Sequence, residues 1–128
     1  MRILIVDDDP LAGELAAAVL EDAGHDCVLA EHGIAALELL ATDTAIGLIV
    51  SDMNMPLISG LELFREHGAQ GRARPFILLT GDDPEPLHAQ APGLAGVLMK
   101  DAALEDSLPA LVATLAVDPA GLVQGRSA

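Results

Sequence analysis

Five polar side chains in this sequence could together carry out chemistry on a phosphoryl group. They are three carboxylates, a hydroxyl and an ammonium group, namely Asp7, Asp8, Asp52, Thr80 and Lys100. Two carboxylates ~4 Å apart repel by roughly 4 kcal/mol at an effective dielectric constant of ~20, so three together need a proton or a bound cation. Oxygen ligands favour a hard cation, with Mg²⁺ first and Mn²⁺ second.

An aspartate beside Mg²⁺, a lysine and a threonine is equipped for phosphoryl transfer to a carboxylate. Such a nucleophile is already anionic and needs no base. The metal and Lys100 would neutralise charge on the phosphoryl oxygens, and Thr80 would donate a hydrogen bond to one of them. Asp52 ends a long apolar run that predicts a strand buried on both faces, which places its carboxylate at the edge of the sheet where ligands bind in open α/β folds.

These side chains can act together only if the fold brings them to one place. Apolar runs predict five strands, at residues 3–6, 27–30, 46–52, 76–80 and 96–99. The polar residues follow or end the first, third, fourth and fifth of these strands. Because the carboxyl ends of parallel strands lie at one edge of a sheet, we expect the five side chains to converge there.

Five segments of helical periodicity alternate with the strands, which predicts an α/β domain with a parallel sheet covered on both faces. Asp9 and Pro10 are typical of a helix start, and Gly24 of a helix end. The pattern predicts a short helix near residues 85–91 and a third helix at 60–67, with Leu61 and Phe64 inward.

Three details of the helices are predicted from spacing alone. Residues expected to face the core are Leu11, Leu15, Ala18 and Val19 of the first helix and Ile34, Leu37, Leu40 and Ala41 of the second. The last helix is expected to be regular from about Ser107, so that Pro109 falls in its first turn. The four histidines show no ligand spacing and are expected at the surface.

Composition narrows the class of protein. A length of 128 residues fits one domain. The net charge of -14 argues against direct nucleic-acid binding, since such a surface repels phosphate backbones. A single cysteine, Cys27, offers no disulfide framework. With neither a signal peptide nor an apolar stretch of membrane-spanning length, the sequence suggests a cytoplasmic protein that does not enter the membrane.

Four short motifs occur in a familiar order: Val6-Asp-Asp8, Asp52-x-x-Met-Pro56, Thr80-Gly81 and Gly-Val-Leu-Met-Lys100. Together they resemble the receiver domain of two-component response regulators over residues 1–117, with residues 118–128 expected to be a flexible C-terminal tail. The resemblance implies a doubly wound, flavodoxin-like sheet of five strands in the order 2-1-3-4-5.

The resemblance also implies roles for individual residues. Asp52 would accept a phosphoryl group from a sensor histidine kinase or a histidine phosphotransfer protein. Mg²⁺ would be bound by Asp8 and Asp52, by Asp7 largely through water, and by the backbone carbonyl of Asn54. Thr80 and Lys100 would bind the phosphoryl group, and inward movement of Thr80 would shift the population of states.

By this resemblance the domain is a phosphoacceptor in signal transduction rather than an enzyme, and its own catalysis is limited to phosphoryl transfer and autodephosphorylation. The fourth helix, fifth strand and last helix would form its output surface, which is also where a homodimer would form. The target or output domain is not identified by the sequence, which fits a stand-alone receiver and a fragment of a longer regulator equally well.

Two positions depart from the common receiver pattern. Val97 stands where many receivers carry an aromatic residue that turns inward with the threonine, so a different switch readout is expected. Asp101 replaces the proline that often follows the lysine, so the preceding bond should be trans, because a cis bond before a non-proline costs about 3 kcal/mol.

Asn54 and Asp82 lie two residues past Asp52 and Thr80, and we expect them to set the dephosphorylation rate.

Two other functions fit parts of the pattern. An aspartyl phosphatase of the haloacid-dehalogenase type would use Asp7 as its nucleophile, but no acidic pair follows Lys100 at a further strand end. A receiver-like interaction module that is never phosphorylated would be expected to have lost Asp52, Lys100 or the acidic pair, and this chain retains them all.

Overall fold

The computed structural model describes residues 1–70 and 74–117, in which five strands alternate with five helices. The strands are β1 (Arg2–Val6), β2 (Asp26–Ala30), β3 (Ile46–Asp52), β4 (Phe76–Thr80) and β5 (Gly96–Met99). The helices are α1 (Pro10–Asp22), α2 (Gly33–Thr42), α3 (Gly60–Ala69), α4 (Glu85–Gln90) and α5 (Leu104–Val117). All strand pairs are parallel and the sheet order is β2-β1-β3-β4-β5, which confirms the expected flavodoxin-like fold.

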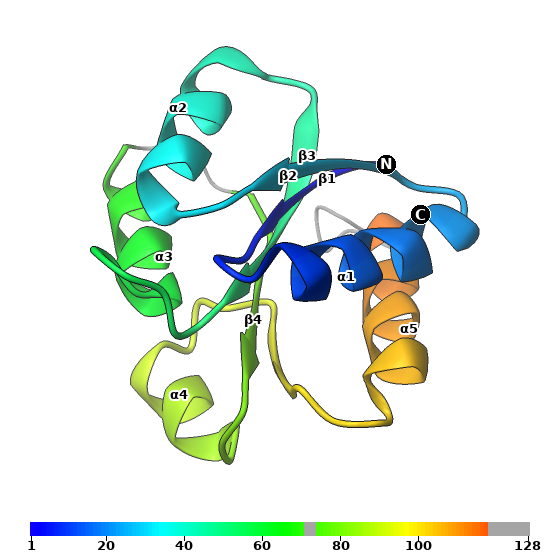
Figure 1. The fold of residues 1–128 in the computed structure, drawn as a ribbon. Coiled ribbons are helices and arrows are strands. Elements are labelled where there is room, and N and C mark those ends of the chain that lie inside the picture. The colour runs from blue at the N-terminus through cyan, green and yellow to red at the C-terminus, as the bar shows by residue number, and fades with distance from the viewer. Residues whose placement is uncertain (71–73, 118–128) are drawn as a thin grey trace, which may run out of the picture.

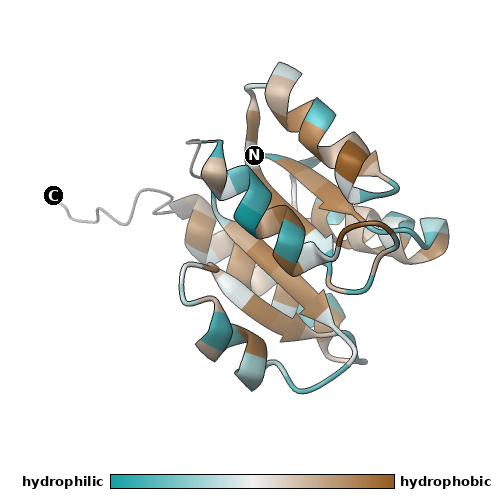
Figure 2. Cartoon of the chain, turned by 90° about the vertical axis from the view of Figure 1, so that its left-hand side faces the viewer, coloured by the Kyte–Doolittle hydropathy of each residue, from teal (hydrophilic) through white to brown (hydrophobic). Residues whose placement is uncertain are grey.

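Helices cover both faces of the sheet, with α1 and α5 on one side and α2, α3 and α4 on the other (Figure 1). Because successive side chains of a strand point to opposite faces, each strand contributes side chains to two separate hydrophobic cores, one on each side of the sheet. On β1, Leu4 and Val6 join the core under α2 and α3, whereas Ile3 and Ile5 join the core under α1 and α5. The strands are therefore apolar along most of their length, which the brown colour of the arrows in Figure 2 shows.

The predicted inner face of α1 is wrong. Leu11 and Leu15 are 66% and 59% exposed, and the buried residues of this helix are Gly13, Ala16, Ala17 and Leu20. Small residues face the sheet because α1 lies close to it: a Cβ on Gly13 would already lie 3.4 Å from Leu29. Apolar residues surround most of this helix, so periodicity alone could not identify the buried side.

Two further helical details differ from expectation. On α2, Ile34 and Ala41 are exposed and Ala36 is fully buried. Helix α5 begins at Leu104, three residues before the predicted start, so Pro109 lies beyond the first turn. The earlier start follows from the turn at Asp101, whose side chain and carbonyl accept hydrogen bonds from the amides of Ala103 and Leu104.

Other local expectations are confirmed or corrected at single residues. Asp9 caps α1 by accepting a hydrogen bond from the amide of Leu11, and Gly24 ends the helix with a φ of 98°. On α3, Leu61 is buried and Phe64 packs edge-on against Phe76. His67, expected at the surface, is buried on the inner side of α3.

The predicted C-terminal tail, residues 118–128, lies outside the described residues. Within the described residues, the search for a helix of sufficient length and apolarity to cross a membrane finds none.

Candidate functional site

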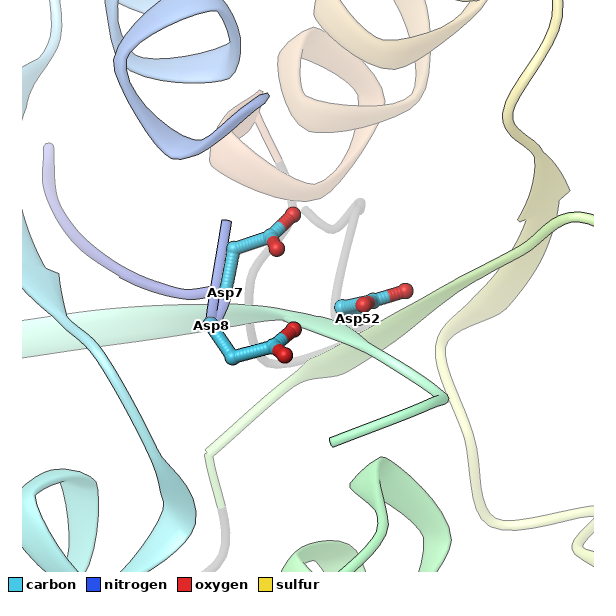
Figure 3. A group of neighbouring side chains, drawn as sticks. All are labelled: Asp7, Asp8 and Asp52. Atoms are coloured by element: carbon cyan, nitrogen blue, oxygen red, sulfur yellow. The ribbon is translucent and has the colours of Figure 1, made fainter. Parts of the chain in front are cut away.

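Three carboxylates meet at the carboxyl edge of the sheet. Asp7 follows β1 directly and Asp52 ends β3, and these two strands pair side by side with Val6 opposite Ser51. One oxygen from each of Asp7, Asp8 and Asp52 lies within 4.8 Å of the others. Figure 3 shows the side chains of Asp7 and Asp8 pointing toward the side on which Asp52 lies. The sequence-predicted acidic cluster is thus present in space.

The three carboxylates differ in their surroundings. Asp7 and Asp52 are only 6% and 7% exposed, whereas Asp8 is open to solvent. The backbone amide of Asp9 donates a hydrogen bond of 2.9 Å to Oδ1 of Asp7, which fixes that carboxylate above the start of α1. The cluster therefore has a rigid, shielded side and an open side through which an ion or a phosphoryl group can enter.

Lys100 is the cation of this cluster. Its Nζ lies 3.2 Å from Oδ2 of Asp7 and 3.3 Å from Oδ1 of Asp52. Lys100 follows β5 at the sheet edge, and β4 separates that strand from β3, so the long side chain must cross the end of β4 to reach both carboxylates. Three ionised carboxylates and one ammonium group leave a net charge of two negative units, which suits a divalent cation.

Thr80 is buried at the end of β4 between these groups, with an exposed fraction of 2%. Its carbonyl accepts a hydrogen bond of 2.7 Å from the amide of Lys100, which ties the ends of β4 and β5 together. Its hydroxyl oxygen accepts a hydrogen bond of 3.1 Å from the amide of Asp82. The hydroxyl proton remains available for a further acceptor, and any movement of Thr80 would act on the loop that carries Asp82.

Burial is the main influence on Asp52. It raises the pKa of this carboxyl, the charge of Lys100 opposes the rise, and the charge of Asp7 adds to it. Burial alone would lower the pKa of Lys100, but its hydrogen bond to Asp7 and the charges of Asp52 and Asp7 outweigh burial, so the pKa rises. The lysine is therefore held in its charged form, while the negative charge on Asp52 is disfavoured until more positive charge arrives.

The donor set fits a hard divalent cation. The cluster offers carboxylate oxygens only, which Mg²⁺ and Mn²⁺ prefer over softer metals. Exposure of Asp8 leaves room for water in the coordination shell, and Mg²⁺ usually retains several waters.

The remaining predicted residues lie around the rim or behind the site. Asn54 and Asp82 are exposed on the loops that follow β3 and β4. Val97 is buried in β5 opposite Leu78 and faces the core under α2, α3 and α4. The bond between Lys100 and Asp101 is trans, as expected, since the described residues contain no cis peptide bond.

Sequence reasoning missed two residues that support the site. Gly33 begins α2 and contacts Ile58, which lies in the loop after Asp52. A glycine at the first position of a helix, where alanine would serve, was the available signal. Gly60 was predicted only as the first residue of the third helix, but a Cβ on it would overlap the carbonyl oxygen of Asp52.

Comparisons with known proteins agree on one family. The family model of the response regulator receiver domain matches residues 3–112. A chemotaxis protein CheY homolog of Campylobacter jejuni is 33% identical over 105 residues, which cover 78% of this chain and 81% of that protein. Response regulator MprA of Mycobacterium leprae is 36% identical over 117 residues, 90% of this chain but 51% of that protein, so this chain spans about half of MprA.

Solved structures give the same result. The response regulator TrrA of Thermotoga maritima, in complex with Mg²⁺-BeF, superposes with a TM-score of 0.80 at 31% identity, covering 89% of this chain and 97% of that chain. A response regulator receiver protein from Pseudomonas putida superposes with a TM-score of 0.77 at 30% identity, covering 88% of this chain and 95% of that one.

Proposed function

This chain belongs to the response regulator receiver domains, which serve two-component signalling, and on that premise we propose that Asp52 accepts a phosphoryl group from a phosphohistidine of a partner protein. The observation that carries the proposal is the position of Asp52: a buried carboxylate at the end of the central strand, beside two other carboxylates and 3.3 Å from an ammonium group. Residues 1–117 form the proposed receiver unit.

The transfer breaks one bond and forms another. A carboxylate oxygen of Asp52 attacks phosphorus, the P–N bond to the imidazole breaks, and its electron pair stays on the imidazole nitrogen, which a proton then neutralises. Asp52 gains an acyl phosphate. Lys100 pairs with a phosphoryl oxygen and the Thr80 hydroxyl donates a hydrogen bond to another, because Lys100 already lies 3.3 Å from Asp52 and Thr80 ends the strand that pairs with β3.

Mg²⁺ is the proposed cofactor, and Mn²⁺ the substitute. Asp8 and Asp52, the backbone carbonyl of Asn54, and Asp7 largely through water would hold it. When bound, the cation supplies positive charge that offsets the carboxylates and the incoming phosphoryl oxygens. Support comes from the oxygen-only donor set of the acidic cluster.

The switch is proposed to begin at Thr80. A hydrogen bond from its hydroxyl to the phosphoryl group would draw Thr80 inward, and the amide of Asp82 would follow because it is bonded to the same oxygen. Val97 is a small, buried aliphatic residue, so the readout here would depend on the loop after β4 and on α4 rather than on a rotating ring. Asn54 and Asp82 would tune hydrolysis of the phosphoryl group.

The phosphodonor is proposed to approach over α1. Leu11 and Leu15 expose apolar surface there, and Leu15 borders an apolar groove between α1 and α5 that reaches Lys100 and Asp7. Neither helix carries a lysine or arginine, so a donor with basic residues beside apolar ones would complement this face. A sensor histidine kinase or a histidine phosphotransfer protein in the cytoplasm would be that donor, and the face of α4, β5 and α5 would serve targets or a homodimer.

The deciding experiment uses acetyl phosphate as a small phosphodonor, with and without Mg²⁺, followed by intact mass. We expect a Mg²⁺-dependent gain of one phosphoryl group in the wild type and in Asp22→Asn, which alters an exposed aspartate on α1, and no gain in Asp52→Asn. A phosphoryl group mapped to Asp7 would instead support the phosphatase alternative. No gain in a wild type that still binds Mg²⁺ would favour an unphosphorylated interaction module.

A further inference from the structure

The loop between Asp52 and α3, residues 53–59, is held by backbone hydrogen bonds where it meets the sheet. We call it the acceptor loop. The amide of Met53 donates a hydrogen bond of 2.8 Å to the carbonyl of Leu79, and the amide of Gly60 donates one of 2.9 Å to the carbonyl of Met53. A Cβ on Gly60 would overlap the carbonyl oxygen of Asp52 and lie 2.6 Å from Leu78. The first turn of α3 is thus pressed against the Asp52 peptide.

The far end of the acceptor loop contains an unfavourable turn. The amide of Ile58 donates a hydrogen bond of 2.9 Å to the carbonyl of Pro56, and Leu57 between them has a φ of 73°. A γ-turn with positive φ is rare and strained for a residue with a side chain. Leu57 is also 80% exposed, so its side chain contributes little packing that could hold the turn. Neighbouring residues must hold it instead.

Gly33, the first residue of α2, lies against this turn. A Cβ on Gly33 would overlap both Cδ1 and Cγ1 of Ile58, the residue that completes the turn. Gly33 is buried and its φ lies outside the left-handed region, so lack of space, rather than backbone conformation, requires glycine here. Ile58 also packs against the core under α2 and α3.

The acceptor loop in turn acts on the phosphoacceptor. A Cβ on Gly60, where the loop ends, would overlap the carbonyl oxygen of Asp52, and the loop carries Asn54 two residues beyond this phosphoacceptor. The carbonyl of Asn54 is one of the proposed Mg²⁺ ligands. A shift of the loop would therefore disturb both the orientation of the nucleophile and one ligand of the cation.

We propose that Gly33 is a positioning residue for phosphoryl transfer: by admitting the side chain of Ile58, it holds the acceptor loop in the strained turn that places Asn54 beside Asp52. This inference rests on the proposed role of Asp52. It assigns a function in the site to the start of α2, an element that contributes none of the proposed ligands or phosphoryl-binding groups.

Gly33→Ala tests the contact, and Gly96→Ala is its matched control. A Cβ on Gly96 would lie 2.5 Å from the tip of Leu111, so this variant also forces a half-buried aliphatic side chain to move, but at the opposite edge of the sheet from the site. Ile58→Ala and the double variant Gly33→Ala/Ile58→Ala complete a cycle. Ile58→Ala opens space rather than closing it, so it tests the contact even if Gly33→Ala does not fold.

Three measurements separate positioning from stability. Hydrogen exchange at the amides of Ile58 and Gly60 reports the loop without reference to function. Calorimetric titration gives Mg²⁺ affinity, and intact mass gives the rate of phosphorylation by acetyl phosphate.

We expect Gly33→Ala and Ile58→Ala to speed exchange at both amides and to weaken Mg²⁺ binding or slow phosphorylation by about tenfold or more, as for other groups that orient ligands. Gly96→Ala should melt at a lower temperature with Mg²⁺ affinity and phosphorylation unchanged. In the Ile58→Ala background, Gly33→Ala should cause little further change in loop exchange, Mg²⁺ affinity or phosphorylation rate, because the Ile58 atoms that a Cβ on residue 33 would overlap are absent.

Each contrary result has a distinct meaning. In one case Gly33→Ala loses stability to the same extent as Gly96→Ala, while its loop exchange and phosphorylation rate stay normal. That result would overturn the inference and leave the proposed function standing. Equal effects of Gly33→Ala in both Ile58 backgrounds would also overturn it. Faster loop exchange in Gly33→Ala, with a wild type that acetyl phosphate does not modify, would mean that the contact holds the loop but that the proposed function has failed.

Discussion

The ammonium nitrogen of Lys100 lies 3.3 Å from a carboxylate oxygen of Asp52, although the two residues end strands that are separated by β4. The same nitrogen lies 3.2 Å from Asp7. One lysine therefore neutralises part of the charge of two nearly buried carboxylates. The Lys100–Asp52 ion pair must rearrange when Asp52 is phosphorylated in the proposed reaction. The strength of this arrangement can be measured.

Removal of the Lys100 charge should destabilise the fold at neutral pH. Lys100→Met leaves Asp7 and Asp52 without their cation, at an expected cost of about 2–3 kcal/mol, below the range for fully buried pairs because the lysine side chain is 28% exposed. The loss should shrink at mildly acidic pH, because the pKa of Asp52 is raised and its carboxylate takes up a proton there. Urea unfolding followed by circular dichroism measures this, with Lys100→Arg as the charge-preserving control. An equal loss at both pH values would contradict the explanation.

Asp52 should make folding stability depend on pH. Burial raises its pKa, so the folded state binds the proton more tightly than the unfolded state. Without Mg²⁺, stability should be greatest below the ordinary value of 3.8 and should fall as pH rises through the raised folded pKa. Asp52→Asn should lack this contribution and be more stable than the wild type at neutral pH, while Asp22→Asn should not. A less stable Asp52→Asn at neutral pH would argue against an unfavourable buried charge.

Mg²⁺ should stabilise the wild type through the acidic cluster. At a concentration ten times its dissociation constant, a ligand that binds only the folded state adds about 1.4 kcal/mol. Asp8→Asn should abolish most of this gain without lowering the stability of the metal-free protein, because it removes an exposed charge that repels two others. Thermal unfolding with and without Mg²⁺ tests this. A full Mg²⁺ effect in Asp8→Asn would exclude Asp8 as a ligand.

The exposed residues Asn54 and Asp82 should set the lifetime of the phosphorylated state. Each lies two residues beyond a residue of the site, where it could orient a water that attacks the acyl phosphate. Replacing both by alanine should lengthen the lifetime severalfold, measured by intact mass after removal of acetyl phosphate. Asp83→Ala, on the same loop, is the control. An unchanged lifetime in the double variant would end this hypothesis.

The corrected face of α1 leads to a contrast between two leucines. Leu20→Ala should cost about 2–5 kcal/mol because Leu20 is fully buried. Leu15→Ala should cost about 0.5 kcal/mol or less, because this side chain is mostly exposed. Urea unfolding of the two variants measures the difference. Comparable losses would mean that Leu15 faces the core as its spacing suggested.

The sequence by itself was sufficient for the fold class and for the residues that meet at the sheet edge. Buried strands are continuous apolar runs, and a polar residue at the end of such a run, such as Asp52, marks the edge directly. Parallel pairing then brings strand ends together without any knowledge of side-chain packing, so Asp7, Thr80 and Lys100 could be placed near Asp52 from their positions alone.

Only the tertiary structure decided which surfaces pack and at what distance. Leu15 lies outside and Ala17 inside because α1 approaches the sheet through small residues, a choice that depends on the neighbouring strand and not on the helix. The contact of Gly33 with Ile58 joins residues from different elements through a space that no local pattern describes. Sequence periodicity describes the pattern within one helix or strand, whereas packing depends on the surfaces of two elements in contact. For this reason the site residues could be predicted from the sequence, but the residues that pack behind them could not.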